Sequence, residues 1–354
     1  MKHHSVRMLA VCAALLVPTP GTAQDSGDVF RKYEADVSKA VDRGFEYLLS
    51  VEQPDRTFPG GHGRSTGISS LVGMCFLAKG HTPGNGRYGK AIERRIEYAL
   101  DKTNDEGLID AGDHGNGPMY AHNISTLFLS ECSGMVDLKL QKRIDEVLPK
   151  AINLLLRAQA VQKSEQHQGG WRYHPGSNDS DLSCSGWALM ALRSARLNGA
   201  PVPPKSIDAA VKYIHGNFER KLGHFGYMDP YQHKESLTGA GLLCLELCGR
   251  HAAPENIKAG DWILENFERL PHAEFETYGN YYNAQGMFQL GGKYWKRYAD
   301  WMYPHYLAEQ QDDGSWKDNR LDKVYGTAML ILAFTVPCRQ LPIYQRDERI
   351  DEDQ

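Results

Sequence analysis

The chain has 354 residues, of which 41% are hydrophobic and 24% charged, a composition typical of a folded domain with a large core. Its formal net charge at pH 7 is only −4, and no cluster of lysine and arginine is interleaved with aromatic residues. Nucleic-acid binding requires a basic surface, so we exclude nucleic acid as a partner.

The first residues have the pattern of an export signal. Lys2 and Arg7 precede an apolar run over residues 8–18, and small residues follow at positions 21–23. We expect residues 1–23 to be a signal peptide and the mature chain to begin near Gln24, in the periplasm or secreted. No later stretch reaches the roughly 20 apolar residues that a membrane-spanning helix needs, so no transmembrane segment is expected in the mature chain.

Paired helices are expected along the rest of the chain. After a polar lead-in over residues 24–36, apolar residues at helical spacing predict a helix over 37–53, and a smaller, more apolar helix follows over 68–80. The same pairing recurs five times. The further pairs are 90–104 with 123–135, 142–159 with 183–197, 204–220 with 237–249, 259–270 with 282–290, and 293–310 with 324–334. No strands are expected.

The two kinds of helix predict two layers. A helix that is apolar nearly all round is buried on most sides, whereas an amphipathic helix faces water on one side. Residues 183–192 align with residues 236–245, which indicates an internal repeat. We therefore expect an all-α fold, an (α/α)6 toroid of six helical hairpins over residues 37–338. The acidic residues 339–354 are expected to be a solvent-exposed tail.

The long loops are expected to gather at one end of such a toroid. They join outer to inner helices and carry Gly, Trp, Tyr, His and Asp, and the amino ends of the inner helices have partial positive charge. We call this end the mouth and expect a site there. The candidate ligand-binding residues are Tyr120, His122, Asp181, Ser183, Trp187 and Tyr282. The alternative for His122 is a helix-end hydrogen bond to a neighbouring loop, and for the aromatic residues simple packing.

Two short motifs support this fold. They are Gln310-x-x-Asp313-Gly314-Ser315-Trp316 and the shorter Gln166-x-x-Gly169-Gly170-Trp171. With them the chain, from about residue 37 to 338, resembles the superfamily of squalene cyclases and protein prenyltransferase β-subunits, in particular exported bacterial proteins with prenyltransferase and squalene oxidase repeats. The resemblance implies αα-toroid repeats in which the glutamine bonds backbone ends and the tryptophan stacks nearby. It does not carry an activity with it.

The catalytic signatures of that superfamily are incomplete here. Squalene cyclases use an Asp-x-Asp-Asp cluster, and residues 178–181 read Asn-Asp-Ser-Asp, so one acidic position is missing. Prenyltransferases bind zinc through an Asp-x-Cys pair and a later histidine. Asp181 matches the aspartate and His233 could supply the imidazole, but Ser183 replaces the thiolate and serine is a poor zinc ligand. We expect no metal and no cofactor.

The cysteines are expected to be buried thiols. Six remain after the expected signal cleavage, and five of them lie in apolar helical runs, where a free thiol behaves as a small hydrophobe. These five are Cys75, Cys132, Cys184, Cys244 and Cys248.

The sequence favours an exported toroid that binds a ligand, isoprenoid or glycan, or a protein partner at the mouth. One alternative is an isoprenoid-processing enzyme that uses Asp181 and His122. Another is a glycosidase or lyase, for which Asp181 and Glu235 are the candidate carboxylates. Whether the protein is an enzyme stays open at this point.

Overall fold

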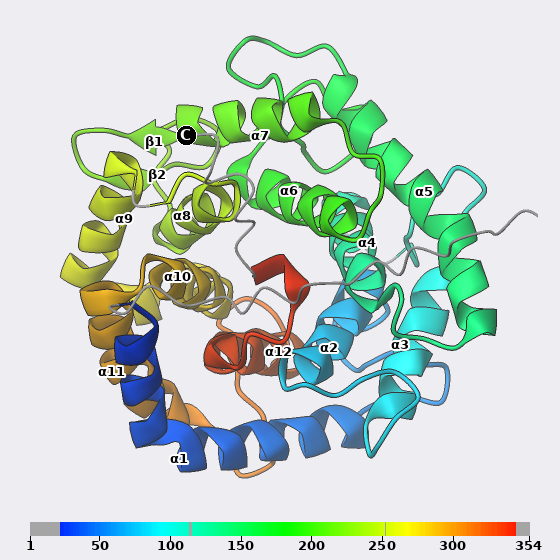
Figure 1. Ribbon diagram of the computed structural model, residues 1–354, viewed down its shortest axis with the longest axis horizontal. Helices are drawn as coiled ribbons and strands as arrows, with labels where there is room; N and C mark the ends of the chain where they lie inside the picture. Colours follow the sequence, from blue (N-terminus) through cyan, green and yellow to red (C-terminus); the bar gives the residue numbers. More distant parts are fainter. Residues whose placement is uncertain (1–21, 113–114, 252, 345–354) are drawn as a thin grey trace, which may run out of the picture.

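The computed structural model describes residues 22–112, 115–251 and 253–344, so nearly all of the expected export signal lies outside the described residues. Within these residues, twelve α-helices form two concentric rings (Figure 1). The outer ring consists of α1 (Thr22–Ser50), α3 (Gly89–Asp101), α5 (Leu138–Ala160), α7 (Pro204–Gly216), α9 (Pro254–Glu265) and α11 (Gly292–Glu309). The inner ring consists of α2 (Thr66–Ala78), α4 (Met119–Cys132), α6 (Leu182–Leu197), α8 (Thr238–Leu247), α10 (Glu276–Leu290) and α12 (Lys323–Phe334).

Both rings are closed by contacts between the two ends of the chain. Each inner helix packs against the next, and α12 contacts α2, while α1 packs along α11 in the outer ring. Every residue of α2 and of α8 is buried, whereas outer helices such as α3 bury one stripe and expose the other. This arrangement confirms the (α/α)6 toroid.

Several element boundaries differ from the expectation. Helix α1 begins at Thr22, so the expected lead-in over residues 24–36 is helical, and Val29 on it is buried. Helix α10 begins at Glu276, six residues earlier than expected, because buried polar and aromatic residues replace the apolar pattern there. A two-residue pairing of β1 (Phe218–Glu219) with β2 (His224–Phe225) also corrects the expectation of no strands.

The end of the chain returns into the ring. After α12, the short 3₁₀ turns η3 (Val336–Cys338) and η4 (Pro342–Tyr344) fold back over the carboxyl ends of the inner helices (Figure 1). Leu341 and Ile343 are buried, and Arg193 Nη1 of α6 donates a 2.6 Å hydrogen bond to the Ile343 carbonyl. The expected exposed tail is therefore wrong for residues 341–344, whereas Arg339 and Gln340 are exposed. Residues 345–354 lie outside the described part.

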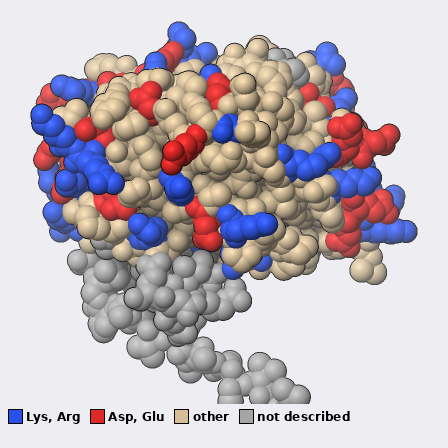
Figure 2. Space-filling model, turned by 90° about the horizontal axis from the view of Figure 1, so that it is seen from above, with Lys and Arg blue, Asp and Glu red and all other residues tan. Residues whose placement is uncertain are grey.

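The surface mixes charges of both signs. In the face that Figure 2 shows, lysine and arginine side chains are interspersed with aspartate and glutamate. This agrees with the small net charge of −4. Among the described helices, none combines the length and the apolar character that crossing a membrane requires.

Candidate functional site

Two tryptophan turns link the outer ring to the inner ring. Trp171 Nε1 donates to the Leu155 carbonyl of α5 at 2.8 Å, and its backbone N–H donates to Ser185 Oγ of α6 at 2.8 Å. Trp316 repeats both bonds, to the Tyr306 carbonyl of α11 at 2.7 Å and to a hydroxyl of α12 at 2.9 Å. Both tryptophans are buried. Each turn therefore ties the end of one outer helix to the start of the next inner helix.

The glutamine of the first turn is not the one expected. In the second turn, Gln310 Nε2 donates to the Gly314 carbonyl at 2.9 Å and to a carbonyl of the neighbouring helix α1 at 2.8 Å. In the first turn the equivalent bonds come from Gln159, to the Gly169 carbonyl and to helix α7, both at 2.8 Å. Gln166 lies in the inserted loop between them and bonds a carbonyl on the α7–α8 connection. Its expected role is corrected in favour of Gln159.

Asp181 caps helix α6. Its Oδ1 accepts hydrogen bonds from the Cys184 backbone N–H at 2.8 Å and from Ser183 Oγ at 2.7 Å, and its Oδ2 lies 3.3 Å from Arg172 Nη1. The helix therefore opens at Asp181 and not at Ser183. Burial raises the pKa of Asp181 to about 6, although these hydrogen bonds and the Arg172 charge act in the opposite direction. The carboxyl group can therefore change its protonation state near neutral pH.

A group of tyrosines and one arginine surrounds this aspartate. The Ser183 hydroxyl is in close contact with the Tyr120 hydroxyl, so a hydrogen-bonded chain runs from Asp181 through Ser183 to Tyr120. The Arg172 guanidinium lies 4.3 Å from the ring centre of Tyr173 and 5.4 Å from that of Tyr227. The hydroxyls of these two tyrosines bond each other. We call these residues the mouth cluster: Tyr120, Arg172, Tyr173, Asp181, Ser183 and Tyr227.

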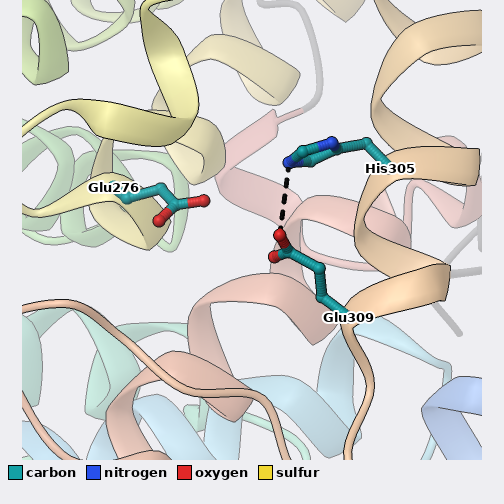
Figure 3. A group of neighbouring side chains, drawn as sticks. All are labelled: Glu276, His305 and Glu309. Atoms are coloured by element: carbon teal, nitrogen blue, oxygen red, sulfur yellow. Dashed lines mark ion pairs between the residues drawn. The ribbon is translucent and has the colours of Figure 1, made fainter.

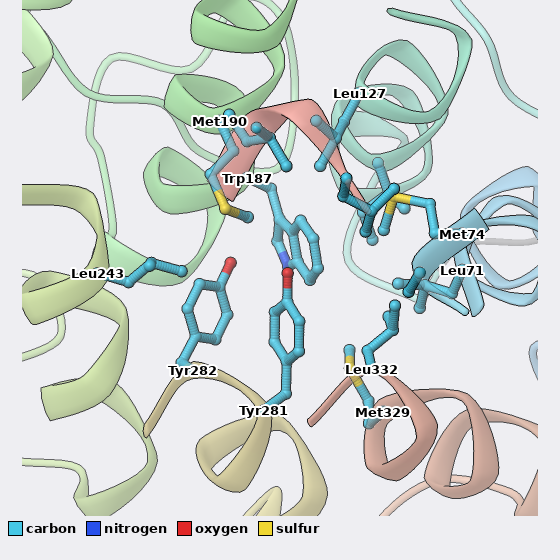
Figure 4. Close-up of a cluster of buried hydrophobic side chains, with 14 of the residues drawn as sticks. Leu71, Met74, Leu127, Trp187, Met190, Leu243, Tyr281, Tyr282, Met329 and Leu332 are labelled. Atoms are coloured by element: carbon cyan, nitrogen blue, oxygen red, sulfur yellow. The ribbon is translucent and has the colours of Figure 1, made fainter. Parts of the chain in front are cut away.

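Two further expected site residues lie in the centre of the ring. Trp187 stacks on Tyr281 with ring centres 5.5 Å apart, and Tyr282 meets Trp187 edge-on at 5.4 Å. All three are buried, so the expectation that Trp187 and Tyr282 surround an opening is wrong for this structure. Figure 4 shows them packed among leucines and methionines of the inner helices. The labelled partners are Leu71, Met74, Leu127, Met190, Leu243, Met329 and Leu332.

His122 does not face the mouth. Its Nδ1 accepts from the Ile109 backbone N–H at 3.2 Å, and its Nε2 lies 3.2 Å from the Ala151 carbonyl of α5. Nε2 therefore carries the proton. Burial lowers the pKa of His122 to about 4, so the ring is neutral. The expected position at the mouth is corrected: His122 ties α4 to the preceding loop and to the outer ring.

The zinc ligands that the superfamily would supply are not assembled at Asp181. The ring centres of His233 and His224 lie 4.1 Å apart with the rings tilted by 41°, and Trp262 meets His233 edge-on at 5.3 Å. In the part of the chain that the structure describes, the three side chains close enough to share a metal ion are Glu276, His305 and Glu309. The six described cysteines are free, and Cys75, Cys132, Cys184 and Cys244 are buried, as expected for thiols in the core, whereas Cys248 is only partly buried.

No protein-family model matches the sequence, and no curated protein matches it. Solved structures do share its fold. A type II terpene cyclase, MstE from Scytonema, in complex with the substrate geranylgeranyl dihydroxybenzoate, has a TM-score of 0.57 at 12% identity, over 87% of this chain and 99% of that one.

A second kind of protein has the same architecture. An inactive variant of the α-1,6-mannanase GH76A of Salegentibacter sp. HEL1_6, in complex with α-1,6-mannotetrose, has a TM-score of 0.61 at 10% identity, over 85% of this chain and 99% of that one. A protein from Actinoplanes has a TM-score of 0.53 at 13% identity. The TM-scores establish a common αα-toroid fold, and at these low identities they show no common activity.

Proposed function

We propose that this protein binds an apolar ligand of the isoprenoid class in the centre of the toroid, with the polar end of the ligand at the mouth cluster. The observation that carries this proposal is the Tyr282 hydroxyl, which is buried in the centre and, among the described residues, has no hydrogen-bond partner within 3.5 Å. Leaving a buried hydroxyl unpaired costs about 1–3 kcal/mol, so such groups in a folded protein call for a specific reason. The oxygen at the polar end of the ligand, lying between Tyr282 and the mouth cluster, would provide one.

The centre and the mouth cluster are connected through Tyr278. Its ring centre lies 4.7 Å from that of Tyr282. Burial raises the pKa of Tyr278, and the negative charge of Asp181 adds to this effect, which places the two groups within electrostatic range. A ligand that displaces side chains in the centre would therefore meet Tyr278 and then the Asp181–Ser183–Tyr120 chain.

The chemistry of the centre favours an isoprenoid over a glycan. Its methionines are unbranched and adaptable, so they can repack around an apolar chain, and its aromatic faces attract positive charge of the kind that develops on a polyene. A glycosidase needs two accessible carboxylates across a cleft. Asp181 is fully buried and its oxygens are occupied, so a pair of Asp181 with Glu235 is disfavoured. The terpene cyclase neighbour binds a geranylgeranyl compound, which supports the same choice.

The hydrogen-bonded chain Asp181–Ser183–Tyr120 also supports the proposal that the protein is an enzyme. An acid with a pKa of about 6 is protonated in a useful fraction of molecules near neutral pH. Hydroxyl groups connect it to the position proposed for the polar end of the ligand. We therefore propose acid-assisted processing of the isoprenoid as the reaction to look for.

Two tyrosine variants test the proposal, with native mass spectrometry against geranylgeraniol and against α-1,6-mannotetraose. Tyr282→Phe removes the unpaired hydroxyl, so it should raise the free energy of unfolding by about 1 kcal/mol and weaken geranylgeraniol binding by about tenfold. Tyr281→Phe is the matched control. Its hydroxyl bonds Tyr344, so its loss should lower stability.

Three outcomes contradict the proposal. They are a Tyr282→Phe variant that is less stable than the wild type, a variant that binds geranylgeraniol as well as the wild type does, and a wild type that binds only the mannotetraose. The last outcome would favour the glycan-binding alternative.

A further inference from the structure

A second group of chemically reactive side chains lies away from the mouth cluster, between α10 and α11. Glu276 is the first residue of α10, and His305 and Glu309 lie one turn apart near the carboxyl end of α11. Figure 3 shows the three side chains converging from the two helices. One ligand atom from each, a carboxylate oxygen or an imidazole nitrogen, lies within 4.8 Å of both others.

Local structure explains why these side chains point to one place. Residues at i and i+4 share a helix face, so His305 and Glu309 project together, with His305 Nε2 3.6 Å from Glu309 Oε1. Trp301 stacks on His305 with ring centres 5.3 Å apart and an interplanar angle of 15°, which fixes the plane of the imidazole. The start of α10 is capped by Asp318, whose carboxylate accepts from Thr277 N and Oγ1. Glu276 is therefore not needed as the cap.

The polar atoms around this point are only partly paired with one another. Within the described residues, His305 Nε2 is buried and has no hydrogen-bond partner, while the hydroxyl of buried Tyr306 next to it has the Glu276 carboxyl as its neighbour. Two carboxylates also approach each other here, and no lysine or arginine of the described residues forms an ion pair with either. An unpaired nitrogen beside two neighbouring carboxylates is an environment that a cation would satisfy.

We propose that Glu276, His305 and Glu309 bind one divalent transition-metal ion, Zn²⁺ or Mn²⁺. Imidazole with carboxylates suits these ions, whereas an all-oxygen set would favour Mg²⁺ or Ca²⁺. Zinc ligands lie about 2.1 Å from the metal, so two of them are at most about 4.2 Å apart. The ligand atoms of the three side chains lie within 4.8 Å of one another. A small rotation of the Glu309 side chain would bring them within the zinc distance, and Glu309 can rotate because half of its side chain is exposed.

The proposed site has the ligand number of a reactive site. Three protein ligands leave at least one coordination position for water or for an oxygen of a bound molecule, whereas structural zinc sites use four. The site is also separate from Asp181, Ser183 and His233, for which the sequence predicted no metal. It does not depend on the isoprenoid proposal.

The test is metal binding by the full chain after chelator treatment, followed by calorimetric titration with Zn²⁺, Mn²⁺ and Mg²⁺. Cobalt(II) serves as a spectroscopic probe, because its visible absorption reports the ligand geometry. We expect about one Zn²⁺ or Mn²⁺ per chain with Mg²⁺ at least tenfold weaker. Glu309→Gln should weaken binding at least tenfold, and His305→Ala should abolish both binding and the cobalt spectrum.

The matched control is His215→Ala, which removes another histidine that faces a glutamate, Glu255, at 3.1 Å. It should leave metal binding unchanged. Glu309 is half-exposed, so Glu309→Gln should fold like the wild type, and its melting temperature checks this. Absence of binding to the wild type overturns the proposal. Two other results would also overturn it. One is metal binding that is retained in both Glu309→Gln and His305→Ala, and the other is metal binding that His215→Ala weakens as much as His305→Ala does.

Discussion

The two tryptophan turns have the same framework and different surroundings. Both have a glycine at positive φ, Gly169 at 97° and Gly314 at 86°, pressed against the backbone of the next outer helix. Both end in an aspartate that caps the following inner helix: Asp181 bonds the Cys184 N–H at 2.8 Å, and Asp322 bonds the Tyr325 N–H at 3.0 Å. The glycine and the capping aspartate are therefore structural parts of the repeat.

The surroundings of the two capping aspartates differ. Arg172, directly after the first tryptophan, contacts Asp181 and two tyrosine rings. Lys317 has the same position in the second turn and is exposed, and Asp322 Oδ2 is buried without a hydrogen-bond partner. A capping aspartate alone is therefore no sign of catalysis. The feature that the first turn has and the second turn lacks, within the described residues, is the mouth cluster around Arg172.

The largest predicted loss of stability should have the same size in the two turns. Trp171→Ala and Trp316→Ala each remove a buried ring and the hydrogen bond of its indole N–H, so each should lower the free energy of unfolding by about 3–5 kcal/mol, measured by urea denaturation. A loss in only one of them would mean that the two turns are not equivalent parts of the framework.

The second predicted effect is a pH-dependent loss of stability, which should be larger for Asp181 than for Asp322. The folded pKa of Asp181 is about 6, above its ordinary value of 3.8, so folding stabilises the protonated form. The resulting stability is complete below pH 3.8 and is lost as the pH rises through 6, by roughly 3 kcal/mol. Asp181→Asn keeps a capping side chain and should remove this loss.

Asp322→Asn is the control for that measurement. Burial also raises the pKa of Asp322, but this side chain is only partly buried, so the variant should change the pH dependence in the same direction and by less. Melting temperatures between pH 4 and 7 compare the two. If Asp322→Asn changes the pH dependence more than Asp181→Asn does, the pKa of Asp181 is not the more strongly raised of the two.

The smallest effect on stability should coincide with the clearest effect on binding. Arg172→Gln removes a partly exposed ion pair and should lower the free energy of unfolding by about 1 kcal/mol, while it weakens geranylgeraniol binding about tenfold. Lys317→Gln, the equivalent change in the second turn, should alter neither. Equal binding by both variants in native mass spectrometry would show that the mouth cluster is not part of the site.

Helix pairing and ring closure were predictable because they follow from the contrast between amphipathic and fully apolar segments. The same contrast explains the error at His122. Nearly all of α4 is buried, so no apolar stripe indicates which of its sides faces the centre and which faces α5. Gln159 was missed because ten residues separate it from Gly169, whereas four separate Gln310 from Gly314.

The group proposed to bind metal shows a different kind of limit. His305 and Glu309 form a recognisable i, i+4 pair, but Glu276 comes from the preceding hairpin and from residues that had been assigned to a loop. Only the packing of α10 against α11 brings it to the other two. In the same way, the contact of Tyr344 with Tyr281 depends on a chain end that composition alone suggests is solvated.

The closure of the outer ring has a consequence for the order of folding. Helix α1 is held by partners almost 270 residues away: Lys32 pairs with Asp300 at 2.8 Å, and Gln310 bonds the Ala40 carbonyl at 2.8 Å. Helix α1 can pack Phe45 against Phe76 of α2 early, but it cannot complete its native contacts until the last hairpin has been synthesised. Long-range contacts of this kind slow folding, and until they form the apolar side of α1 needs protection. Holding factors that keep the nascent chain unfolded should therefore raise the yield of native toroid.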